Sequence, residues 1–177
     1  MPRRRLSPSE VREAQVVFAS ELPYHRVWIH ESARWPNWLA SLGSALFGTP
    51  PPAGGNAITL GYSCYFPHRL RTADVDFEAR IFGDMAWLMH ELTHVWQYHH
   101  IGGSYVTKAL RSQFGKGLKA YDYGGLAGLQ SAAAAHRSLN DFNPEQQGDI
   151  ARDYYIRLKL SLSKEAWEPF VAEFRGA

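Results

Sequence analysis

Apolar positions near the amino end of the chain recur at the spacing of an amphipathic helix. Four of them lie three or four residues apart and so share one helical face: Val11, Ala14, Phe18 and Leu22. The segment Ser7-Pro8-Ser9-Glu10 supplies a capping serine, a proline at the first helical position and a glutamate three residues after the cap. These residues predict a first helix that begins at this segment.

Two segments have the pattern of β-strands. Between Tyr24 and His30, Val27 and Ile29 alternate with polar and aromatic residues, which predicts a strand. The segment Ala57–Phe66 is rich in β-forming residues and is closed by a proline, which predicts a second strand. Between them we expect a short helix over 36–46 and a loop over 48–55, where glycine and proline predominate.

The second half of the chain predicts helices. The strongest candidate runs from Asp84, which fits a cap, to His100, and it has a wide apolar surface. The following segment, 126–139, contains an alanine-rich helical stretch. A third helix starts at the Asn143-Pro144-Glu145-Gln146 capping pattern and extends to about residue 162, and a last amphipathic piece carries Trp167, Phe170 and Phe174. Two strands among about five helices define an α+β fold that is mostly helical.

Size and composition indicate one globular domain over 1–177, with residues 1–6 as a flexible, solvated tail that includes Arg3-Arg4-Arg5. The net charge of +2 is too small to indicate nucleic-acid binding. No apolar run approaches the roughly 18 residues of a transmembrane helix, and no signal peptide follows the basic start. Cys64 is the only cysteine, which excludes an intrachain disulfide and a cysteine-based zinc site, and we expect a buried thiol there.

The motif His90-Glu91-Leu92-Thr93-His94 lies within the strongest predicted helix. Histidines four residues apart project from one helical face, so both imidazoles can reach one zinc ion. Glu91 lies about 100° round the helix from His90, where its carboxylate can take a proton from a metal-bound water without binding the metal. The pattern therefore predicts a zinc site with His90 and His94 as ligands and Glu91 as general base.

A third ligand has two candidates. His100 occupies the position of the third histidine in the long HExxHxxGxxH motif, but Gln97 replaces the glycine at which that motif turns. In a continuous helix His100 lies about 240° round and about 9 Å along from His94 and faces away. Glu145, with Asp149 one turn later, offers a ligand carboxylate and a second carboxylate that can accept the free N–H of a metal-bound imidazole. This arrangement favours Glu145 as the ligand.

A hydrolytic zinc site also needs a donor for the oxyanion. The tyrosines Tyr121 and Tyr123 lie in a glycine-flanked turn that can reach over a cleft, so we predict them as catalytic donors. Other donors available in this half of the chain are His136, Arg152, Tyr154 and Tyr155. The predicted strand Ala57–Phe66 precedes the zinc helix, and its edge can pair with an extended peptide substrate.

Several motifs resemble one family. HELTHVWQ, a downstream YDY, the helix EQQGDIARDYY, and the upstream SPSE and YHRVWIH are similar to bacterial metallopeptidase domains related to the valine-glycine-repeat spike proteins of type VI secretion systems. The resemblance covers residue 7 to about 155 and implies a zincin-like toxin domain with a glutamate ligand, in which Glu145 is the third ligand and Asp149 its acidic neighbour. The alanine-rich stretch over 126–138 departs from the pattern.

Together these features predict a zinc-dependent peptidase that acts as a secreted effector against bacteria or a host. Its expected partners are a protein or peptide substrate, a secretion-spike protein and an immunity protein, and export without a signal peptide would place it in the target-cell periplasm or the host. Two alternatives remain open: an amidase that cuts peptidoglycan, and a structural or docking module of a secretion particle that binds zinc without turnover.

Overall fold

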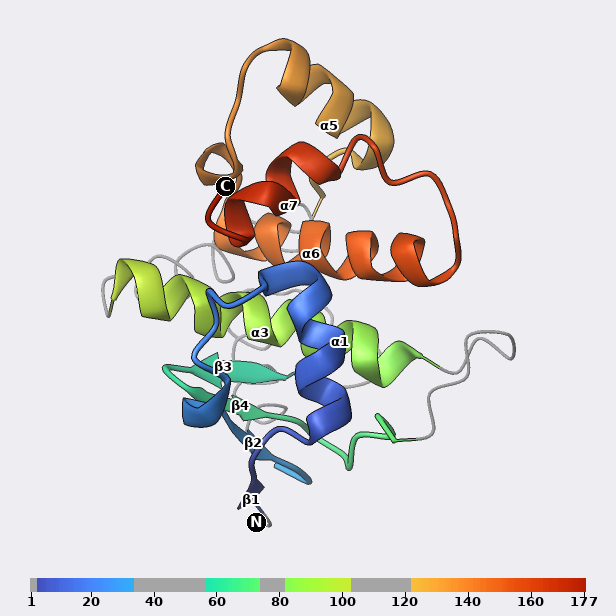
Figure 1. Cartoon of the computed structure of the whole chain (residues 1–177). Helices are drawn as coiled ribbons and strands as arrows, with labels where there is room; N and C mark the ends of the chain where they lie inside the picture. Colours follow the sequence, from blue (N-terminus) through green and yellow to red (C-terminus); the bar gives the residue numbers. More distant parts are fainter. Residues whose placement is uncertain (1–2, 34–56, 74–81, 103–121) are drawn as a thin grey trace, which may run out of the picture.

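The computed structural model in Figure 1 describes residues 3–33, 57–73, 82–102 and 122–177. In these ranges the chain is mostly helical with one small sheet, which confirms the predicted α+β class at that level. The helix expected over 36–46 and the loop expected over 48–55 lie outside the described residues.

The sheet of the described ranges has four short strands in the order β1-β2-β4-β3, and these strands are β1 (Arg3–Arg4), β2 (Trp28–His30), β3 (Ile58–Leu60) and β4 (Ser63–Tyr65). β2 and β4 are parallel, whereas β1 and β3 run antiparallel to their neighbours. The register pairs Ile29 with Cys64, and both side chains are fully buried, as the sequence predicted for the thiol. Because β3 is last in the strand order, it forms one outer edge of this sheet.

The segment predicted as a single strand over Ala57–Phe66 is a hairpin instead. β3 and β4 are separated by a turn at Gly61 and Tyr62, and Gly61 adopts a positive φ of 61°. Glycine reaches this conformation without steric cost, so the chain can reverse at this point. β-forming residues on both sides of the turn conceal the reversal in the sequence pattern.

Of the residues 1–6 predicted as a solvated tail, the described ones begin with a strand that joins the sheet. Arg3 and Arg4 form β1, which pairs with β2. The Arg4 guanidinium forms ion pairs with Glu10 at 2.7 Å and with Glu31 at 3.0 Å. The pairing with β2 and the ion pair with Glu31, which is 27 residues away, are not local in sequence, and they hold this segment to the domain.

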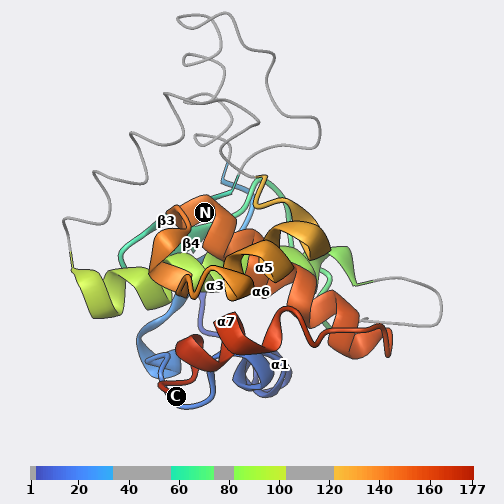
Figure 2. The ribbon, with the colours of Figure 1, turned by 90° about the horizontal axis from the view of Figure 1, so that it is seen from above.

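The helices stack above the sheet in Figure 1, where α3 (Gly83–Ile101) lies between the sheet and α6 (Pro144–Lys159), and α1 (Pro8–Phe18) crosses α3. α5 (Gly125–Ala134) lies beyond α6 in Figure 1, and α7 (Glu168–Phe174) packs against both α6 and α1. Figure 2 shows α3, α6 and α5 superposed in the view from above. None of the helices in the described ranges has an apolar stretch long enough to cross a bilayer.

Capping explains where two of the main helices begin. Ser7 and Glu10 form the predicted capping box of α1, and Asn143 and Gln146 form that of α6. α3 differs from the prediction, because it begins after Phe82 and no side chain caps it. The Asp84 carboxylate instead accepts a hydrogen bond from the backbone N–H of Arg71 at 2.7 Å.

The helical stretch predicted within 126–139 is confirmed as α5. α5 ends at Ala134, and His136 takes a positive φ of 53°. A single 3-10 turn, η3 (Leu139–Asp141), then leads into α6, and another, η1 (Tyr24–Arg26), precedes β2. Of the strand predicted between Tyr24 and His30, only the last three residues, which form β2, are a strand.

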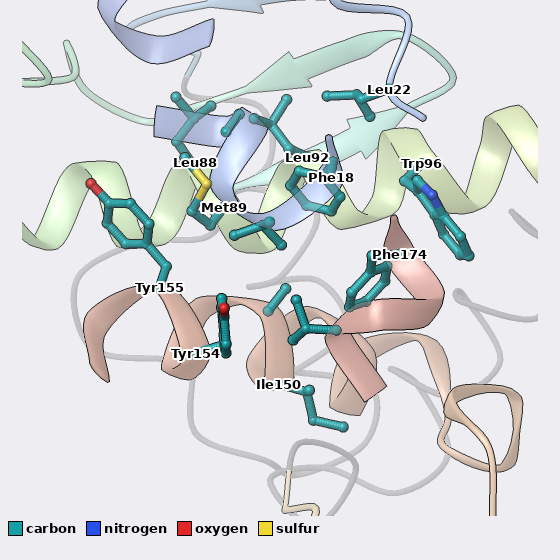
Figure 3. Packing of buried hydrophobic residues seen from close by; sticks show 14 of the residues in the cluster. Phe18, Leu22, Leu88, Met89, Leu92, Trp96, Ile150, Tyr154, Tyr155 and Phe174 are labelled. Carbon is teal, nitrogen blue, oxygen red and sulfur yellow. The ribbon is translucent and has the colours of Figure 1, made fainter. Parts of the chain in front are cut away.

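The core fills the space between α3 and its neighbours (Figure 3). Leu92 of α3 and Phe18 of α1 are fully buried, and Tyr155, which is also fully buried, points from α6 toward α3. Phe174 of α7 packs edge-on to the indole of Trp96, with ring centroids 5.0 Å apart. These contacts fix α3 against α6, and the polar residues that these two helices bury lie at the same interface.

Candidate metal centre

The interface between α3 and α6 brings three candidate ligands together. His90 and His94 lie on successive turns of α3, both buried, with their Nε2 atoms 3.2 Å apart. Glu145 lies in the first turn of α6 and is 1% exposed. Its Oε2 is 3.2 Å from the Nε2 of His90 and 3.7 Å from the Nε2 of His94.

These separations fit a bound metal ion. Tetrahedral ligands that each lie about 2.0–2.1 Å from zinc are about 3.3–3.4 Å from one another. The three separations observed here, 3.2, 3.2 and 3.7 Å, bracket that spacing. Two imidazoles and a carboxylate are also a donor set that zinc uses, with a fourth position left for water or substrate. The group can therefore hold a metal ion.

The charges around this group favour a cation. Burial alone lowers the pKa of an imidazole, but the hydrogen bonds of His90 to Asp149 and Glu145 outweigh it and raise its pKa to about 10. For Glu145, burial alone raises the pKa, but the two neighbouring histidines outweigh it and lower the pKa below its usual value. The carboxylate is thus ionised, and the group stabilises positive charge between the three side chains.

Outer partners orient both imidazoles. The Nδ1 of His90 donates to Asp149 at 2.9 Å, as the sequence predicted for the carboxylate one turn after Glu145. Arg152 in turn donates to the same Asp149 oxygen at 2.5 Å. The Nδ1 of His94 lies 2.9 Å from the side-chain oxygen of Gln97. Both Nε2 atoms consequently point at Glu145.

A glycine makes the close approach of the helices possible. A Cβ atom built on Gly148 of α6 would lie 2.7–2.9 Å from ring atoms of His90, which is closer than real contacts allow. Residue 148 therefore has to lack a side chain if His90 is to lie against α6 between Glu145 and Asp149. A glycine inside the otherwise regular helical pattern EQQGDIA is the sequence signal for such packing.

Glu91 follows His90 in the sequence but has a different partner from the three candidate ligands. Its carboxylate accepts a hydrogen bond from the Thr59 hydroxyl of β3 at 2.7 Å. The side chain is buried, and the group of candidate metal ligands does not include it. This placement suits a base that addresses the metal position without binding there. Thr59 was not singled out from the sequence, because only the three-dimensional fold brings β3 to α3.

His100 lies away from the candidate ligands, as the continuous helix predicted. Its Nδ1 donates to the backbone carbonyl of Trp96 at 2.9 Å, and its ring stacks on the Trp96 indole with centroids 4.4 Å apart. Its Nε2 is 3.5 Å from a carboxylate oxygen of Glu21. α3 runs without interruption through Gln97, so the turn required to bring His100 back does not occur.

The structure describes one of the two predicted oxyanion donors, Tyr123. Tyr121 lies outside the described residues. The Tyr123 hydroxyl donates to Asp153 at 2.6 Å and accepts from the Trp167 indole at 3.1 Å. Tyr123 also lines an open hollow of about 270 Å³ with Leu126, Arg157 and Trp167 among its walls. A role for Tyr123 as oxyanion donor stays a prediction.

Fold and site together define a mixed α+β chain whose two central helices bury a His-His-Glu group suited to a metal ion. In an alignment of 157 residues that covers 86% of the chain, it is 30% identical to the type VI secretion system spike protein VgrG2b of Pseudomonas aeruginosa. The chain spans 13% of the length of that relative. No family model matches the chain, and no solved structure matches it.

Proposed function

We propose that this chain is a zinc-dependent peptidase in which His90, His94 and Glu145 hold the metal and Glu91 is the general base. The observation that carries the proposal is the spacing of the three ligand atoms, 3.2, 3.2 and 3.7 Å, in a buried group. Structural zinc sites normally have four protein ligands, whereas catalytic sites have three and an open position. The group within the described residues offers three.

A zinc ion held by these residues would act as a Lewis acid, which lowers the pKa of water and polarises a carbonyl group. The chain's own contribution is positional. Asp149 and Gln97 hold the Nδ1 atoms of the two histidines, so that each Nε2 faces the metal position. The surrounding core limits access of bulk water, which strengthens electrostatic interactions at the site.

In the proposed reaction Glu91 takes the proton of the attacking water. It is the residue after His90, and the Thr59 hydroxyl fixes one of its carboxylate oxygens. A carboxylate held in this way can accept a proton from the attacking water and return it to the leaving amine. Thr59 lies on the edge strand β3, so an extended peptide that paired with this edge would pass next to Glu91.

The similarity to VgrG2b supports a role in type VI secretion. That relative is a spike protein, and the chain matches a part of it that is 13% of its length. We infer that the chain is a secreted effector domain carried by, or related to, such a spike. Export by this route, action in the target-cell periplasm or a host, and neutralisation by an immunity protein belong to the same proposal.

Hydrolysis of a generic unfolded protein such as casein by the zinc-loaded chain tests the enzymatic part. We expect cleavage by the unaltered chain, and no cleavage by Glu91→Gln with its zinc content unchanged. Cleavage that persists in Glu91→Gln contradicts the assignment of the base. Release of amide-cleavage products from peptidoglycan, with protein left intact, would favour the amidase instead, and zinc binding with neither activity would favour a docking module.

A further inference from the structure

We propose that Gln97 and Gln147 form an amide relay, a chain of hydrogen bonds that determines which ring nitrogen of His94 carries the proton. The relay also connects His94 to the segment that precedes Glu145. The proposal rests on the metal site proposed above. Gln97 is fully buried and Gln147 is 5% exposed, so neither side chain is placed for contact with solvent. In the sequence alone, Gln97 is notable only as the residue that replaces the glycine of the long zinc motif.

The orientation of Gln147 is fixed by backbone atoms. Its Nε2 lies 3.0 Å from the carbonyl oxygen of Leu139 and 3.0 Å from that of Phe142. Carbonyl oxygens only accept hydrogen bonds, so the amide NH₂ group of Gln147 has to face them. Its Oε1 consequently faces the other way, toward α3.

The orientation of Gln97 follows from that of Gln147. The Oε1 of Gln147 lies 2.7 Å from the Nε2 of Gln97, which donates to it and also to the Pro144 carbonyl at 3.1 Å. With its NH₂ group engaged by two acceptors, Gln97 presents its own Oε1 to the Nδ1 of His94 at 2.9 Å. An amide oxygen only accepts, so Nδ1 carries the proton and the Nε2 lone pair is directed at the metal position.

The two histidines are therefore oriented by different chemistry. His90 depends on a carboxylate, Asp149, one turn along α6 from Glu145. His94 depends on neutral amides whose direction is imposed by three backbone carbonyls, those of Leu139, Phe142 and Pro144. These carbonyls belong to the segment that leads into Glu145, so the relay couples the position of one ligand to the orientation of another.

The decisive variant is Gln147→Met, because Gln147 does not touch His94. Methionine has a similar length and suits a helix, but it cannot donate to the carbonyls or accept from Gln97. We expect the zinc dissociation constant, measured by competition with a chelating indicator, to rise about 10–100-fold, the range typical of lost outer partners. Gln97→Met should weaken binding at least as much. The visible spectrum of bound Co²⁺ should shift in both variants, because the geometry around His94 changes.

Tyr155→Phe is the matched control for a loss of stability alone. Tyr155 lies on α6, as Gln147 does, and the substitution removes its 2.7 Å hydrogen bond to Glu13 of α1. This bond does not involve a candidate ligand. We expect Tyr155→Phe to lower the urea midpoint but to keep the zinc affinity and the Co²⁺ spectrum. Zinc affinity in folded Gln147→Met equal to that of the control overturns the relay. Absence of metal binding in the unaltered chain would instead contradict the proposed function itself.

Discussion

His90 donates a hydrogen bond from its Nδ1 to the Asp149 carboxylate, and that carboxylate also accepts one from Arg152. A carboxylate partner makes an imidazole a stronger metal ligand, but the shared Arg152 reduces the negative charge that His90 experiences. Glu145 instead lies between two imidazoles, which outweigh the effect of burial and lower the pKa of its carboxyl group below the usual range. Its negative charge is therefore available to the metal position across the neutral pH range.

These contacts predict a ranking of single substitutions. Glu145→Ala removes a ligand and should abolish tight zinc binding. Asp149→Asn keeps the shape but loses the charge and should weaken zinc binding about 10–100-fold. His100→Ala should leave zinc affinity unchanged, because His100 stacks on Trp96 away from the ligands. Isothermal titration with zinc measures all three, and a large loss in His100→Ala with none in Glu145→Ala would contradict the ligand assignment.

The sequence indicated much of this site because its residues lie at helical spacings. His90 and His94, like Glu145 and Asp149, are four residues apart, and such pairs share a face wherever the helix lies. Gln147 and Thr59 could not be predicted in the same way. Each reaches the site through tertiary contacts between segments some 30 to 50 residues apart, and no local pattern distinguishes them.

At the scale of elements, the packing of α3 on α6 determines whether the ligands meet. Tyr155 of α6 is fully buried and points toward α3, and Gly148 allows the His90 ring to approach α6 closely. The helix starts at Pro8 and Pro144 were predictable because capping is local. The β3–β4 hairpin and the pairing of β1 were not, because strand pairing joins residues distant in sequence.

Gly148→Ala separates helix propensity from packing. Alanine in a helix interior is favoured over glycine by about 1 kcal/mol, so propensity alone predicts a more stable chain. The added Cβ instead meets the His90 ring at 2.7 Å, and overpacking of this kind costs about 1–3 kcal/mol. We expect a lower urea midpoint and weaker zinc binding. Higher stability with unchanged zinc affinity would show that the helices do not approach as closely as described.

At the scale of the whole molecule, an ion-pair network joins the amino end to the sheet. The buried carboxylate of Glu10 accepts hydrogen bonds from Arg4, from the Thr72 hydroxyl at 2.6 Å and from the backbone N–H of Ser7. Burial alone raises the pKa of Glu10, but these partners outweigh it and lower the pKa below its usual value of 4.5. Charged Glu10 therefore stabilises the folded chain above pH 4.5, and this contribution is lost as the pH falls through its lower folded-state pKa.

Glu10→Gln should remove this contribution. We expect the free energy of unfolding at pH 7 to fall by about 1.5–3 kcal/mol, the usual size for a buried hydrogen bond to a charged group. Its decline with acid below about pH 4.5 should also become shallower than in the unaltered chain. Urea unfolding from pH 7 to pH 3, with a chelator present throughout, measures both. An unchanged acid dependence would show that Glu10 is not paired in the folded state.

Metal analysis of the natively purified chain is the decisive experiment for the proposed zinc site. The account predicts about one zinc ion per chain, which His90→Ala loses and Glu91→Gln keeps. Chelation should remove the ion while the far-ultraviolet circular dichroism is largely retained, because the core around Phe18, Leu92 and Ile150 does not depend on the metal. A chain that contains no transition metal as purified, and binds none when zinc is added, would contradict the account.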